Sequence, residues 1–76
     1  MHKTGPQTMS TDNLRVGKCY FIQNYGESTS FIVLETIGTD DYRVKDLLSL
    51  EIYDFSLLTQ YGLGTDFVLR EINCAY

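Results

Sequence analysis

The stretch that most constrains the fold is residues 30–36, Ser-Phe-Ile-Val-Leu-Glu-Thr, where four large apolar residues stand in a row. The run is β-branched in part and has turn-forming residues close on either side. It is too short for an independent helix and too apolar for a solvated edge. We therefore predict a central strand that pairs with the runs before and after it and sets the register of a small β domain.

The same run is apolar on both of its predicted faces. In a strand, Phe31 and Val33 point to one side and Ile32 and Leu34 to the other. A single small domain has only one core, so one of these faces must be covered by curvature, by a helical turn, by the tail or by a partner. The excess apolar face is the sequence feature that most favours association.

The run before it predicts an antiparallel partner. Residues 18–24, Lys-Cys-Tyr-Phe-Ile-Gln-Asn, are rich in aromatic and β-branched side chains, which favour strands. The segment that follows contains Gly26, which supplies the positive φ of a tight reversal. We expect a hairpin formed by the first two strands.

A third strand is predicted at residues 41–46, after a turn that contains Gly38. Apolar and polar side chains alternate strictly along it, with Tyr42 and Val44 on one face and Arg43 and Lys45 on the other. One side of the sheet should therefore face water.

The segment from 47 to 61 fits two interpretations, because its apolar residues match a period of two at first and a period near 3.6 throughout. We predict a fourth strand at 49–53, with Asp54 as the N-cap of a short helix over 55–61 that Gly62 ends. A single helix over 46–61 remains the alternative.

Length limits the chain to one domain. Of its 76 residues, the polar segment 1–13 is predicted to be a flexible tail, and 14–73 to form the domain, with the last strand at 66–72. A domain of this size buries only ~60% of its unfolded surface and often relies on a disulfide, a metal or a partner.

The cysteines do not indicate a metal site. Cys19 and Cys74 lack the CxxC or Cys/His spacing of zinc ligands, and the single histidine, His2, lies in the tail. We expect no metal and no other cofactor. If the first and last strands pair, the two cysteines come near the same edge and could form a bridge. However, the start of the chain lacks the apolar core of a signal peptide, so we predict a cytoplasmic protein with reduced thiols.

Composition disfavours two classes of partner. The net charge of −4 and pI near 4.6 give an average field that repels nucleic acid and anionic lipid. No apolar run approaches the ~18 residues of a membrane span. A local basic face formed by Lys18, Arg43 and Lys45 would be needed for nucleic-acid binding, and this is the alternative function.

The predicted order of four strands, a helical turn and a fifth strand resembles SH3-like small barrels. Three segments are similar to Tudor-type barrels: Arg-Val-Gly-Lys at 15–18, Phe-Ile-Val-Leu-Glu at 31–35, and Asp-Phe-Ser-Leu-Leu at 54–58. The resemblance implies an all-β fold, a small five-stranded antiparallel barrel whose first and last strands pair. It is a likeness of fold, and fold does not imply function.

Ligand-reading Tudor domains hold a methylated ammonium group between aromatic ring faces. The corresponding positions of this chain carry Gln23 or Asn24, Ser30, Lys45 and Leu47, none of which is aromatic. The resemblance therefore does not extend to recognition of methylated lysine or arginine.

No nucleophile with its base, carboxylate pair, metal cluster or phosphate-binding loop is recognisable, so we expect no enzyme and no small-molecule substrate. The predicted function is a small non-enzymatic protein-interaction or assembly module, with a protein partner or a second copy. Its tyrosines suit contact surfaces as well as packing. The candidate interaction surface comprises Tyr20, Tyr25, Tyr42, Arg43, Lys45 and Tyr53.

Overall fold

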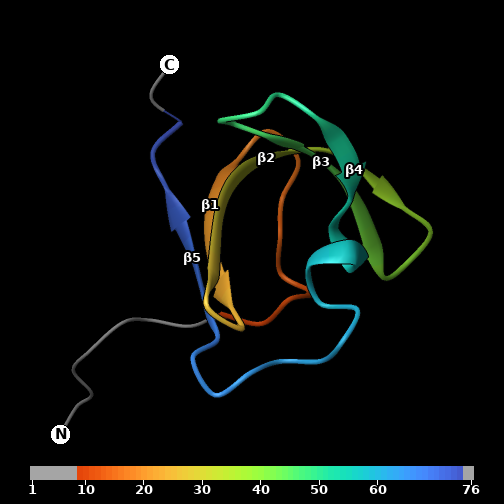
Figure 1. Cartoon of the computed structure of the whole chain (residues 1–76). Coiled ribbons are helices and arrows are strands. Elements are labelled where there is room, and N and C mark those ends of the chain that lie inside the picture. Colours follow the sequence, from red (N-terminus) through yellow and green to blue (C-terminus); the bar gives the residue numbers. More distant parts are fainter. Residues whose placement is uncertain (1–8, 75–76) are drawn as a thin grey trace, which may run out of the picture.

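The computed structural model describes residues 9–74, which form one antiparallel sheet in the order β4-β3-β2-β1-β5 (Figure 1). The elements are β1 (Cys19–Asn24), β2 (Glu27–Ile37), β3 (Asp41–Asp46), β4 (Ile52–Asp54), the 3-10 turn η1 (Phe55–Leu58) and β5 (Val68–Ile72). The predicted all-β class, with five strands and one helical turn before the last, is confirmed. The sheet curls, but β4 and β5 do not pair within residues 9–74, so the expected barrel is open.

The predicted central strand occupies the middle of the sheet. β2 extends over 11 residues, pairs with β1 on one side and β3 on the other, and is longer than the apolar run that predicts it. The hairpin with β1 turns at Tyr25 and Gly26, whose φ values are 51° and 80°. Two consecutive residues with positive φ match the twist of a two-residue hairpin, and glycine adopts this conformation without steric cost.

A bulge in β2 interrupts the second apolar face that the sequence predicts for this strand. The pairing with β3 shifts register between Val33 and Glu35, which leaves Leu34 without a partner. Val33 points into the core at 1% exposure, whereas Leu34 is 38% exposed and Glu35 beside it also faces water. Ile32 is only half-buried. The outer face of β2 therefore remains partly apolar.

The segment after β3 differs from the predicted boundaries. The fourth strand is shorter and later than predicted, and the single helix over 46–61 is wrong. The reason is a tight turn: the Asp46 carboxylate accepts the N–H groups of Leu48 and Ser49 at 2.7 and 2.9 Å. Leu50 completes the turn in a left-handed conformation, φ 66°, which interrupts any helix.

The predicted helix over 55–61 is the 3-10 turn η1, which ends at Leu58. Asp54 occupies the N-cap position but makes no capping hydrogen bond with its side chain. The Asp41 side chain makes the bonds to the start of η1 instead. Its carboxylate accepts the Ser56 N–H at 3.1 Å and the Ser56 hydroxyl at 2.8 Å. A long-range contact from β3 thus anchors η1.

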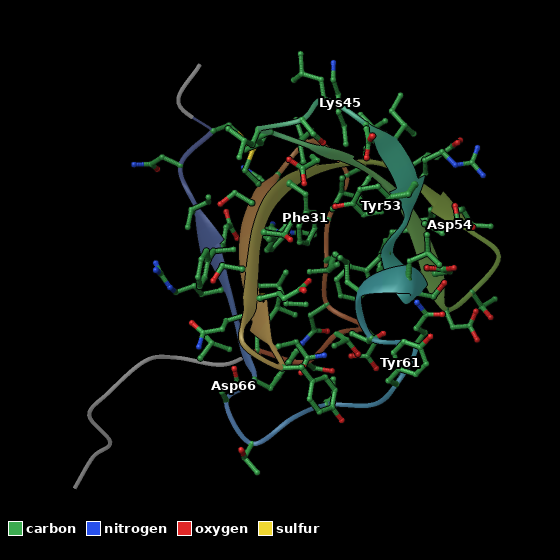
Figure 2. The ribbon with its side chains drawn as sticks, viewed as in Figure 1. Phe31, Lys45, Tyr53, Asp54, Tyr61 and Asp66 are labelled. Atoms are coloured by element: carbon green, nitrogen blue, oxygen red, sulfur yellow. A yellow bond between two sulfur atoms is a disulfide. The ribbon has the colours of Figure 1, made fainter. Side chains whose placement is uncertain are left out.

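The core fills the concave face of the sheet with aromatic rings, and Figure 2 shows Phe31 at its centre. Ring centroids lie 5.8 Å apart for Tyr20 and Phe31, 5.6 Å for Phe31 and Phe55, and 6.1 Å for Tyr42 and Phe55. Such spacings are typical of favourable aromatic pairs. The remaining buried members of the cluster are Leu14, Ile22, Val33, Val44 and Leu69.

The prediction of free thiols is wrong, because Cys19 and Cys74 form a disulfide with their Cα atoms 5.3 Å apart. The β1–β5 register explains the pairing: Cys19 lies opposite Ile72, and Cys74 follows two residues later on the same side of the chain. The prediction rested on the expected compartment, whereas strand register decides which residues meet.

The chain before β1 also contacts the sheet. The Met9 N–H donates to the Leu69 carbonyl at 2.9 Å, and the Met9 side chain packs against the core cluster. Residues 1–8 of the predicted tail lie outside the described residues. Within residues 9–74, the structure contains no helix of the length and apolarity that crossing a membrane requires.

Candidate binding groove

A groove of about 560 Å³ opens at the end of the concave face where the β1–β2 hairpin meets η1 and the loop after it. This volume is in the range of ligand-binding sites. We call it the hairpin groove. It is lined by Ile22, Asn24, Tyr25, Glu27, Thr29, Leu57, Leu58, Gln60 and Tyr61.

The buried side chain of Asn24 holds the loop that forms one wall. Its amide nitrogen donates to the carbonyls of Leu58 and Gly62 at 3.2 and 3.0 Å, and its oxygen accepts the Gly64 N–H at 2.8 Å. Both amide hydrogens and the carbonyl oxygen are thus in use. A single residue at the end of β1 fixes the path of the chain from 58 to 64.

Asp66 holds the hairpin turn from the other side. Its carboxylate accepts the N–H groups of Tyr25 and Gly26 at 2.9 and 2.8 Å, and the Gln23 amide approaches it at 3.4 Å. The hydrogen bond from Gly26 is the main reason why the pKa of Asp66 lies below its usual range. Two carboxylate bonds therefore fix the turn that carries Tyr25.

Tyr25 is held in place at its backbone and at its ring. Its hydroxyl donates to the Tyr61 carbonyl at 3.0 Å. Its ring lies against Gly64, where an added Cβ would stand 3.0 Å from the ring atom Cδ1. Gly64 is needed here because it has no side chain, and the resulting close contact fixes one aromatic wall of the groove.

The walls of the groove present large side chains to solvent although their backbones are fixed. Tyr61 is 82% exposed, Tyr25 57% and Leu57 53%. Of the lining residues only Glu27 is charged. The lining offers aromatic faces, an apolar floor and one carboxylate, which suits binding of a side chain or peptide, and it has no histidine, cysteine or lysine for covalent or acid–base chemistry.

The structure distributes the predicted interaction surface over separate places. Tyr20 and Tyr42 lie in the core at 0% and 8% exposure, and Tyr25 alone of the predicted residues lines the groove. Lys45 lies on the outer face of β3, and Figure 2 places it at the opposite end of the view from Tyr61.

Arg43 shares the outer face of β3 and is surrounded by acidic side chains. Its guanidinium lies 3.2 Å from the Glu35 carboxylate and 3.5 Å from that of Asp54. These half-exposed ion pairs neutralise the cation.

Tyr53 is half-buried, and its hydroxyl lies 3.4 Å from the Asp46 carboxylate. Burial, and then the negative charge of Asp46, raise the pKa of Tyr53 to about 12. Partial burial of Asp46 works in the opposite direction to the N–H groups of Ser49 and Leu48, and these hydrogen bonds hold the pKa of its carboxyl below the usual range. Both side chains make their contacts at the turn between β3 and β4.

Leu57, Gln60, Tyr61 and Glu27 are groove residues that the sequence prediction omits. The available signal is the repeated Tyr-Gly pair at 25–26 and 61–62, which is explained by shared turn chemistry and carries no information on contact. Only the folded chain shows that the two tyrosines meet.

No family model, curated protein or solved structure matches this chain. Within residues 9–74, no three His, Cys, Asp or Glu side chains gather in a way that could hold a metal ion.

Proposed function

We propose that the protein is a small, non-enzymatic protein-interaction module that contacts its partner through the hairpin groove. The observation that carries the proposal is the combination of fixed backbone and exposed side chains at Tyr25, Leu57 and Tyr61. Exposed tyrosines in a concave surface are typical anchors of binding energy.

Preorganisation supports the same conclusion. Asn24 and Asp66 commit five hydrogen bonds between them to backbone groups of the groove walls. A site whose loops are already ordered loses less conformational entropy on binding. This arrangement supports recognition of a partner.

The alternative of nucleic-acid binding has less support. Of the three residues of its expected basic face, Lys18, Arg43 and Lys45, Arg43 is paired with Glu35 and Asp54. Phosphate binding requires cations that are free to approach the backbone of the nucleic acid. Titration with short oligonucleotides at low salt should produce no salt-dependent binding, and such binding would favour this alternative.

A pair of leucine variants tests the proposal. Leu57 and Leu63 are each 53% exposed, but only Leu57 lines the groove. Affinity capture from lysate should recover a protein with the wild type and with Leu63→Ser, and the recovery should fall with Leu57→Ser and with Tyr61→Ser. Equal recovery with all variants would show that the groove is not the contact site.

Gel filtration with light scattering adds the oligomeric state. If the captured protein is a second copy, wild type and Leu63→Ser should both associate and Leu57→Ser should not. A monomer that captures nothing would contradict the proposed function.

A further inference from the structure

Glu27 gives the hairpin groove a negative charge. It is the only charged residue in the lining, and the whole chain carries a net charge of −4. Among residues 9–74, no lysine or arginine lies within ion-pair distance of its carboxylate. The groove therefore presents an unneutralised negative charge beside apolar surface.

Several other carboxylates of the fold are already committed. The side chains of Asp41, Asp46 and Asp66 accept backbone N–H groups. Those of Glu35 and Glu71 pair with arginines at 3.2 and 3.6 Å. Glu27 makes no such bond within the described residues, so its charge is available to a ligand.

The position of Glu27 determines what a cation would meet. In the β1–β2 register it lies opposite Asn24, next to the turn that carries Tyr25. Tyr61 stands on the loop that Asn24 and Tyr25 hold. A cation held by the carboxylate would therefore share the groove with two tyrosines, whose ring faces attract positive charge.

The remainder of the lining is suited to an aliphatic side chain. Ile22 forms a buried part of the wall, and Leu57 and Leu58 approach from η1. A ligand with only a charge would leave this surface uncovered, and a purely apolar ligand would bury Glu27 without a partner, which is costly.

We infer that the groove receives a peptide segment in which a lysine or arginine stands next to a large aliphatic residue. The cation lies between Glu27 and the tyrosines, and the aliphatic side chain covers Leu57 and Leu58. This inference rests on the proposed function and names the chemistry of the partner.

Three acetylated, amidated tripeptides serve as probes: Leu-Arg-Leu, Leu-Gln-Leu and Leu-Glu-Leu. Each is titrated into the full chain at low salt, and backbone amide shifts are followed by NMR. The arginine peptide should shift the amides of Tyr25, Glu27 and Tyr61 and bind about fivefold tighter than the glutamine peptide, since an exposed ion pair and a cation–π contact are each weak. Added salt should reduce the difference.

Glu27→Gln should remove the preference for arginine over glutamine and retain the weaker apolar binding. Glu51→Gln is the matched control, because Glu51 is exposed in the β3–β4 turn and does not line the groove. A well-dispersed spectrum of each variant shows that it is folded.

The outcomes separate the two proposals. If the arginine and glutamine peptides shift the groove amides with equal affinity, or if Glu27→Gln keeps the preference, the inference fails and the proposed function stands. If none of the peptides shifts these amides at millimolar concentration, the inference also fails, and the capture with Leu57→Ser and Tyr61→Ser decides the proposed function separately.

Discussion

Replacing Asn24 by alanine should unfold the loop wall of the groove. The variant loses three hydrogen bonds, to the Leu58 and Gly62 carbonyls and from the Gly64 N–H, with lengths of 3.2, 3.0 and 2.8 Å. Each is worth about 1 kcal/mol net, so the free energy of unfolding should fall by about 2–4 kcal/mol. For a small domain whose total stability is on the order of 5 kcal/mol, this is a large fraction.

Urea unfolding followed by circular dichroism measures the loss, and hydrogen exchange locates it. Amides of the loop from 58 to 64 should exchange faster, while those of β2 and β3 lose protection only as far as global stability falls. Gln23→Ala is a suitable control, since the Gln23 side chain makes only the long 3.4 Å contact with Asp66. It should cost less than about 0.5 kcal/mol.

Asn24→Asp separates hydrogen bonding from shape. A carboxylate still accepts the Gly64 N–H, but it has no hydrogen for the Leu58 and Gly62 carbonyls and repels their oxygens. The new carboxyl should have a raised pKa in the folded state, so the stability of the variant relative to wild type is highest below the unfolded pKa of ~3.9 and falls as pH rises through the folded pKa.

Two results would refute the reasoning about Asn24. The first is an alanine variant within about 0.5 kcal/mol of wild type, which would mean that other contacts hold the loop. The second is an aspartate variant whose stability, relative to wild type, does not change between acid and neutral pH.

The remaining predictions concern three other features. Cys74→Ser should lower the free energy of unfolding by about 2–4 kcal/mol, because the disulfide spans 55 residues and restricts the unfolded chain. Urea unfolding of the wild type with and without reductant checks this. A wild-type stability that does not change with reductant would contradict it. Tyr53 should ionise near pH 12, and because this folded pKa exceeds the ordinary tyrosine value of 10.0, its contribution to stability is complete below pH 10.0 and lost as pH rises through about 12. Asp46→Asn should lower the pKa of Tyr53 in an ultraviolet titration, and an unchanged curve would exclude the charge as a cause. Gly64→Ala should displace the Tyr25 ring and cost about 1–3 kcal/mol, measured by thermal unfolding, and an unchanged melting temperature would contradict the close contact.

Strands are predictable here where the side-chain pattern has one interpretation. Residues 41–46 alternate strictly, and the structure buries Tyr42 and Val44 and exposes Arg43. Residues 47–61 are ambiguous because apolar spacing does not encode the contacts that decide their structure. The Asp46 side chain bonds to the next turn and ends one element, and the bond from Ser56 to Asp41, 15 residues away, anchors the next.

The candidate site was less predictable than the fold. Asn24 and Gly64 are 40 residues apart, and only folding brings them within 2.8 Å. An asparagine at the end of a strand is also typical of a turn. Its residue type alone therefore does not indicate that its side chain holds a distant loop. Of the predicted residues, Tyr25 lines the groove because a turn residue is exposed by its position.

The disulfide has a mechanical consequence. It joins the first residue of β1 to a residue beyond the end of β5, so a force applied at the two ends of the chain passes from Cys19 to Cys74 through the sulfur bond. The strands and the groove between them carry none of that tension while the bond is oxidised. Among the described residues, the segment that can be pulled straight under load is 9–18, at about 3.4 Å per residue, while the strands between the two cysteines stay paired. In a reducing solution the same force would peel β5 from β1.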